Sequence, residues 1–155
     1  MRREPRAKRT RRLALTVQVA SRSAHLPSPR QLRRWARAAL AQDAEVTLRI
    51  VSQTEGRRLN REFRGRDYPT NVLTFAYSDQ RPLAGDIVLC APVVRREARV
   101  QQRSLTAHYA HLVVHGLLHL QGYDHQRAAE ARRMQSLESE IVTQLGYPDP
   151  NATLA

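Results

Sequence analysis

The stretch of residues 112–125 reads LVVHGLLHLQGYDH and defines the centre of the predicted fold. Its first nine residues are mostly apolar, which is typical of a helix buried in a protein core. His115 and His119 lie four residues apart, so on a helix both imidazoles project from one face. Gly122 then permits a left-handed turn that can bring His125 back toward that face. The stretch therefore predicts a central helix that ends in a cluster of three histidines.

These histidines follow the pattern H-x-x-x-H-x-x-G-x-x-H, the spacing with which metzincin proteases hold zinc and leave a fourth position for water. Neutral imidazoles suit zinc, although nickel, copper or cobalt would also bind them. We therefore expect one Zn²⁺ per chain, bound by His115, His119 and His125. His108 and His111 share a face with His115 and could compete as ligands, but we expect them to pack or to support the ligands because they lie upstream of the apolar segment.

The residue after the first histidine separates two kinds of zinc enzyme. A metalloprotease has Glu there, which takes a proton from zinc-bound water, whereas this chain has Gly116. A metzincin-like protease is therefore the second hypothesis. Glycine inside a helix costs about 1 kcal/mol relative to Ala, so we expect a substrate or a neighbouring helix to pack closely there. Asp124 could either orient an imidazole or cap the following helix.

The flanking sequence predicts a mixed sheet. Alternating or β-branched segments predict strands at 13–19, 46–51, 72–77 and 85–90. Helical spacing and capping residues predict helices at about 29–42, 54–64, 92–101, 104–121 and 127–145. We expect a single domain of the α/β or α+β class, with one mixed four-stranded sheet covered by helices and the metal site at the end of the central helix. Cys90 is expected to be a small buried strand residue.

Charge points to a polyanionic partner. The 155 residues carry 26 basic and 14 acidic side chains, a net charge of +12. Residues 1–12 hold seven of the cations and one Glu, and they are predicted to be a disordered basic arm before a domain at 13–150 and a tail at 151–155. Without the arm, 19 basic and 13 acidic residues still leave a charge of +6. Nucleic acid is therefore the leading partner on charge alone.

No stretch approaches the roughly 20 apolar residues of a membrane-spanning helix, and the basic N-terminus lacks the apolar run of a secretory signal. We therefore expect a cytoplasmic protein that binds no membrane.

The histidine stretch resembles the signature H-G-x-L-H-L-x-G-Y-D-H of the YbeY family of bacterial endoribonucleases. Further matches follow in family order at 59–60, 64–67, 69–75, 85–87 and 110–114, so that the resemblance spans about residues 13–150. Thr74 stands where Ser is usual, and Gln121 stands where an apolar residue is usual; neither is a predicted ligand. The arginine-rich arm is not part of the family pattern.

The resemblance implies a zinc-dependent, single-strand-specific endoribonuclease in 16S rRNA 3′-end maturation and ribosome quality control, with the ribosome or its small subunit as partner. It assigns zinc to the three histidines, including His115 at the catalytic centre, and a functional role to Arg64. From the residues alone, Arg64 could clamp a phosphate or be a solvated cation at a helix end, and Thr70 and Asn71 could contact RNA or shape a turn. A ribosome-assembly factor with a structural zinc is the non-enzymatic alternative.

Overall fold

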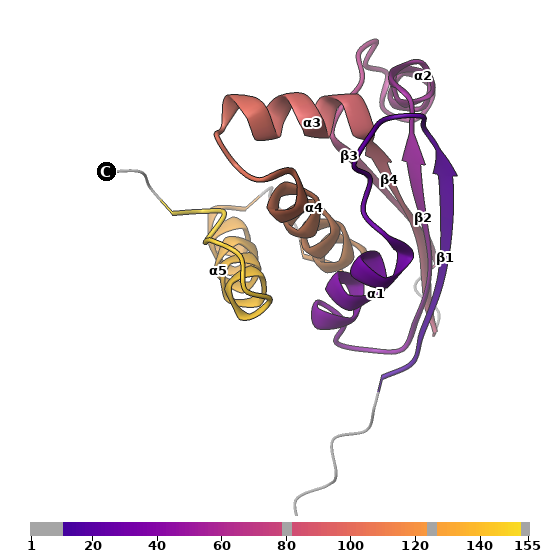
Figure 1. Cartoon of the computed structure of the whole chain (residues 1–155). Coiled ribbons are helices and arrows are strands. Elements are labelled where there is room, and N and C mark those ends of the chain that lie inside the picture. The colour runs from indigo at the N-terminus through magenta and orange to yellow at the C-terminus, as the bar shows by residue number, and fades with distance from the viewer. Residues whose placement is uncertain (1–10, 79–81, 124–126, 153–155) are drawn as a thin grey trace, which may run out of the picture.

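The computed structural model describes residues 11–78, 82–123 and 127–152 (Figure 1). Every strand and helix expected from the sequence is present in these ranges. The elements are β1 (Leu13–Ala20), α1 (Pro29–Ala38), β2 (Ala44–Val51), α2 (Gln53–Arg64), β3 (Val72–Ser78), β4 (Leu83–Cys90), α3 (Ala91–Val100), α4 (Leu105–Leu120) and α5 (Ala128–Gln144).

The four strands form one mixed sheet in the order β1-β2-β4-β3. β1 pairs with β2 in parallel, and β2 pairs with β4 in parallel, each through a connection that contains a helix. β3 runs antiparallel to β4 at the edge of the sheet. The predicted mixed four-stranded sheet is thus confirmed. The fold combines the parallel strand–helix–strand units of α/β proteins with an antiparallel pair.

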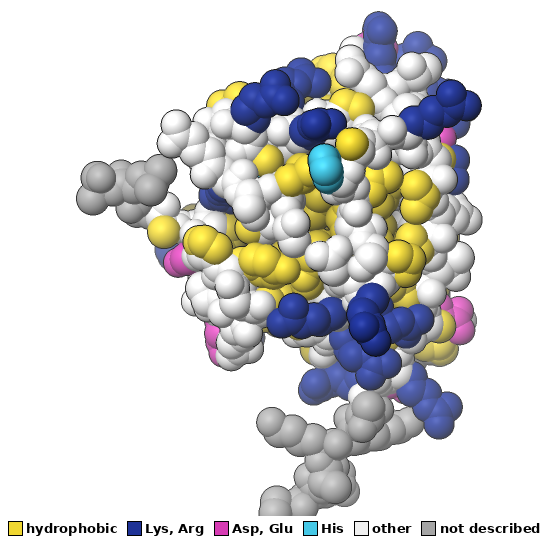
Figure 2. Space-filling view, viewed as in Figure 1, with side chains coloured by type: hydrophobic (Ala, Val, Ile, Leu, Met, Phe, Trp, Pro, Cys, Tyr) yellow, Lys and Arg dark blue, Asp and Glu magenta, His cyan; other side chains and the backbone are white. Residues whose placement is uncertain are grey.

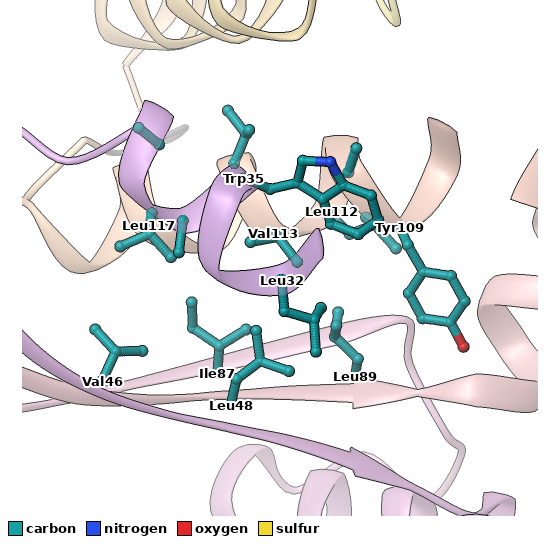
Figure 3. Close-up of a cluster of buried hydrophobic side chains, with 14 of the residues drawn as sticks. Leu32, Trp35, Val46, Leu48, Ile87, Leu89, Tyr109, Leu112, Val113 and Leu117 are labelled. Carbon is teal, nitrogen blue, oxygen red and sulfur yellow. The ribbon is translucent and has the colours of Figure 1, made fainter. Parts of the chain in front are cut away.

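Helix α4 is central, as its apolar sequence predicted. Ten of its sixteen residues are buried, because it lies between the sheet and α5 (Figure 1). The facing strands contribute alternate side chains, among them Leu48 of β2 and Ile87 of β4. Figure 3 shows these residues beneath Leu32 and Trp35 of α1 and beneath Leu117 of α4. Burial of this face on folding holds α4 rigidly against the sheet.

A smaller cluster covers the opposite face of β4. It contains Val51, Leu73, Val88 and Cys90, with Leu59 of α2 packed against them. Cys90 is 1% exposed, and burial raises the pKa of its thiol, which confirms that it is a structural strand residue.

Helix α1 ends at Ala38, four residues earlier than its apolar pattern predicted. The side chain of Gln121, at the end of α4, accounts for the difference. Its amide donates to the carbonyl of Ala39 at 2.7 Å, and its oxygen accepts from the backbone N–H of Ala41 at 2.7 Å. The hydrogen-bonding groups that continue a helix are therefore engaged by a residue about 80 positions away in the chain.

β2 and β4 also begin two residues before their predicted starts, where Ala44 of one strand pairs with Leu83 of the other. Within the described part of the chain, no helix combines the length and apolar character needed to cross a membrane. The predicted basic arm lies largely outside the described residues, which begin at Arg11.

Candidate metal centre

Helix α4 carries a row of four histidines. The helix begins after Ser104, whose Oγ accepts a hydrogen bond from the backbone N–H of Ala107 at 3.0 Å. From there His108, His111, His115 and His119 follow at helical spacing, and neighbouring ring centroids lie 6.3 Å apart. The rings of His115 and His119 are stacked with an interplanar angle of 6°. The structure therefore brings these two predicted ligands together with parallel rings on one face.

A carboxylate from α5 supports this row. Oε1 of Glu138 lies 2.5 Å from Nδ1 of His115, and its Oε2 lies 3.0 Å from Nε2 of His111. Burial alone would raise the pKa of Glu138, but the hydrogen bonds with His111 and His115 lower it to about 2. Glu138 is thus an ionised carboxylate, although it is only 3% exposed. Two imidazoles from α4 share its two oxygens.

Glu138 was not among the site residues predicted from the sequence, although one feature of the sequence points to it. On α5 this residue falls in the buried stripe, four residues after Met134 and four before Val142. A carboxylate in an apolar stripe is seldom buried without a partner. A charged residue on the buried face of a helix therefore marks a candidate for a polar site.

His119 is held by the turn after α4. Its Nδ1 lies 3.0 Å from the backbone carbonyl of Tyr123. Gly122 has a φ of 100°, in the left-handed region that glycine adopts readily. The backbone N–H of Tyr123 donates to the carbonyl of Leu118 at 3.2 Å. The turn predicted at Gly122 is confirmed. Asp124 and His125, the predicted third ligand, lie outside the described residues.

The donor set fits a metal such as zinc. Histidine ligands usually donate their second ring N–H to a carboxylate or a backbone carbonyl, which fixes the ring and its tautomer. His115 makes this contact with Glu138 and His119 makes it with Tyr123, each through Nδ1. Nε2 is then the atom with which each ring would coordinate a metal. Imidazole nitrogen suits Zn²⁺.

A second arrangement of ligands shares His115. One ligand atom each from His111, His115 and Glu138 lie within 4.8 Å of one another, so this group could also hold a metal ion. Here Glu138 would be a ligand rather than a hydrogen-bond partner of the ligands. We expected a supporting or packing role for His111 in preference to a ligand role, and the structure places it at the carboxylate of Glu138. His108 is buried, and its Nε2 lies 3.0 Å from Oε1 of Glu97, in agreement with the packing role expected for it.

The remaining candidate residues, Arg64, Thr70 and Asn71, lie outside the histidine cluster, at or after the end of α2. Arg64 is the exposed last residue of α2, where Gly65 ends the helix with a φ of 69°. Asn71 accepts the N–H of Val72 at 2.6 Å and donates to Glu97 at 3.0 Å, which supports the turn-shaping alternative for this residue. Thr70 is half-buried beside it.

Gly116 faces the sheet. The close neighbour expected at this glycine is the side chain of Ile87 on strand β4, rather than a substrate or another helix. The glycine therefore lets α4 pack closely on the sheet.

Comparisons with known proteins agree with the resemblance of the histidine stretch. The family model described as "Endoribonuclease YbeY" matches residues 19–146. A protein of that name from Nitrosomonas europaea is 59% identical over 138 residues, which cover 89% of this chain and 84% of the relative. The protein of that name from Aromatoleum aromaticum is 57% identical over 144 residues, 91% of this chain and 94% of the relative. A solution structure of a Thermotoga maritima protein is 24% identical with a TM-score of 0.54, covers 90% of this chain and 99% of that one, and supports the fold alone.

Proposed function

Since the chain belongs to the YbeY family of endoribonucleases, we propose that it is a zinc-dependent enzyme that cuts single-stranded RNA. Its proposed role is the maturation of the 3′ end of 16S rRNA and the quality control of ribosomes. The ribosome or its small subunit would be its partner, and the cytoplasm its location.

The observation that carries this proposal is the pair of parallel imidazoles of His115 and His119, each held at Nδ1 by a partner outside α4. Two rings oriented in this way would coordinate a metal through Nε2, and His125 would complete the set. A bound Zn²⁺ supplies Lewis-acid chemistry, either at a phosphoryl oxygen or at a water whose pKa falls toward about 7. The attacking oxygen is that of water or of the ribose 2′-hydroxyl.

The charge distribution supports an anionic substrate. Figure 2 shows arginine side chains gathered in groups on the molecular surface, with one histidine exposed beside one of these groups. Arg64 is exposed at the end of α2 and, among the residues that the structure describes, makes no ion pair. A guanidinium in this setting can bind two phosphate oxygens at once and neutralise charge on the phosphodiester. We assign this role to Arg64.

The proposal is tested by joining metal content to RNA cleavage. The parent protein should hold one equivalent of zinc by elemental analysis, and His115→Ala, His119→Ala and His125→Ala should each lose it. His108→Ala serves as the matched control, because this histidine lies on the same helix but contacts Glu97, and it should retain the metal. The metal-loaded parent should cut a single-stranded RNA that the His115→Ala variant leaves intact.

Two results would contradict the proposal. Stoichiometric zinc in His125→Ala would show that the third ligand lies elsewhere, with Glu138 as the next candidate. Zinc-dependent cleavage of unfolded casein without RNA cleavage would replace the nuclease with the protease alternative.

A further inference from the structure

We propose that Glu138 is the positioning residue of the metal centre and that the C-terminal segment 149–152 holds Glu138 in place. The inference rests on the proposed function, because it assumes that His115 binds the metal through Nε2. It adds two elements that the histidine signature does not contain, the helix α5 and the chain beyond it.

Three donors converge on the single carboxylate of Glu138. His115 contacts Oε1 at 2.5 Å, His111 contacts Oε2 at 3.0 Å, and the side-chain amide of Asn151 contacts Oε2 at 3.4 Å. The carboxylate is almost fully buried, so these contacts replace the water that would otherwise solvate it. A buried anion with both oxygens engaged has a fixed direction, and it therefore fixes the groups that donate to it.

The carboxylate selects one tautomer of His115. Oε1 of Glu138 faces Nδ1 of His115 at 2.5 Å, and a carboxylate oxygen that accepts this hydrogen bond places the ring proton on Nδ1. In the neutral imidazole, Nε2 then has the lone pair that a metal requires. The negative charge beside the ring also raises the basicity of that nitrogen. Glu138 thus orients His115 and prepares it for coordination, while His111 holds the second oxygen.

The C-terminal segment reaches the same carboxylate. Besides its contact with Glu138, the amide of Asn151 donates to the backbone carbonyl of Gln135 at 3.1 Å and to Oγ of Ser139 at 3.2 Å. The backbone N–H of Asn151 donates to Oδ1 of Asp149 at 2.9 Å, which shapes the turn. Of the contacts that the Asn151 amide makes, the one to Glu138 is the longest, so its loss should affect the site less than the loss of Glu138.

The same segment is attached at a second point. The guanidinium of Arg103, in the turn between α3 and α4, donates to the backbone carbonyl of Pro150 at 2.5 Å. The segment therefore connects the start of α4 with α5, the two helices that carry His111, His115 and Glu138. Truncation before residue 149 should loosen the carboxylate without removing any proposed ligand.

The experiment measures metal affinity in the full-length protein by competition with a chromophoric zinc chelator. Glu138→Ala should lower the affinity about 10- to 100-fold, as the loss of a group that orients a ligand does. Glu138→Gln keeps an oxygen that can accept from Nδ1 of His115, so it should recover most of this loss. Asn151→Ala should weaken binding less than Glu138→Ala does.

Glu97→Ala is the matched control. Glu97 contacts His108 on the same helix in the way that Glu138 contacts His111, both at 3.0 Å, but it lies outside the metal centre. This variant should bind metal with the affinity of the parent. The visible spectrum of the cobalt(II)-loaded protein provides a second readout, and Glu138→Gln should keep the band shape and intensity of the parent because the ligands do not change.

Each contrary result has a separate meaning. If Glu138→Ala binds zinc as tightly as the parent does, Glu138 has no positioning role. If the cobalt(II) spectrum changes in both Glu138 variants, Glu138 is itself a ligand, and this result also overturns the positioning role. If Glu138→Ala fails to fold, Glu138→Gln and Asn151→Ala still test the inference. A parent protein that binds no metal would contradict the proposed function itself. This failure is distinct from a failure of the positioning role, in which the parent binds metal and only the affinities of the variants differ from those expected.

Discussion

Gly116 lies directly against Ile87. A Cβ atom added at Gly116 would be 3.1 Å from both Cδ1 and Cγ2 of Ile87, closer than side-chain carbons normally approach. The contact joins the C-terminal half of α4 to the middle of β4, and both residues are buried. The contact therefore sets the distance between the sheet and α4, the helix that carries the four histidines.

We predict that Gly116→Ala destabilises the protein by about 1 kcal/mol. Overpacking a core by one methyl group costs about 1–3 kcal/mol, and the helix propensity of Ala returns up to about 1 kcal/mol. Urea unfolding of Gly116→Ala, Ile87→Val and the double variant should show positive coupling, because Val lacks the Cδ1 atom in question. If the changes in the free energy of unfolding caused by the two single substitutions simply add in the double variant, Gly116 and Ile87 are not coupled and the added methyl group is accommodated without strain against Ile87.

Gly116→Glu is expected to unfold. This substitution would place a carboxylate where metalloproteases carry their base, but here the side chain would be buried against Ile87. Circular dichroism of the purified variant should show loss of helical signal. The substitution therefore cannot convert this site into a protease, and a folded Gly116→Glu protein would contradict this description of the packing.

Arg64→Ala should retain both metal and fold while RNA turnover falls, if Arg64 contacts phosphate. Arg64→Lys should restore little of the turnover, because an ammonium lacks the planar fork that binds two oxygens. Arg58→Ala is the matched control, since Arg58 is another exposed arginine on α2, and it should cut RNA like the parent. Turnover of Arg64→Ala equal to that of the control would return Arg64 to the role of a solvated cation at a helix end.

Removal of residues 1–10 should reduce the salt dependence of RNA binding without altering the cleavage step. This segment contains five of the seven cations of the predicted arm, each of which can displace a counterion from RNA. The deletion should end at residue 10, because Arg12 is bonded to the folded domain. Its backbone N–H donates to the side chain of Asp43 at 2.9 Å, and the carbonyl of Arg12 accepts from the N–H of Ala44.

Fluorescence anisotropy at several salt concentrations measures the effect on binding. A full-length variant with glutamine at the five cationic positions should behave like the deletion, because the prediction concerns charge rather than length. Equal salt slopes for parent, deletion and charge variant would show that the arm serves another purpose.

Glu97 should make the stability of the protein depend on acidic pH. Burial alone would raise the pKa of Glu97, but hydrogen bonds with His108 and Asn71 lower it below its ordinary value. A depressed pKa stabilises the folded state above the unfolded value of about 4.3, and this contribution is lost as the pH falls through the folded value. Urea unfolding of the parent and of Glu97→Gln from about pH 5 to about pH 3 should show their stability difference narrowing. A difference that stays constant over this range would exclude the proposed effect of the ionised carboxylate.

Local sequence determined the elements and the centre of this protein. The helix over His115 and His119, the turn at Gly122 and the alternating strands depend on backbone preferences and on spacing between residues that are near in the chain. The position of His115 and His119 on one face follows from helical spacing, and therefore it could be predicted together with the burial of the surrounding apolar residues, whereas the parallel orientation of the two rings depends on their partners outside α4.

Tertiary structure decided the contacts that join distant segments. The amide of Gln121 ends α1 at Ala38, Ile87 explains Gly116, and Glu138 reaches His115 across 23 positions of the chain. None of these partners follows from local periodicity, because a side chain in one helix specifies its own face but not which element will cover it. The carboxylate of Glu138 reaches the histidines only when α5 packs on α4, where burial removes its water and leaves the imidazoles and the amide of Asn151 as its donors.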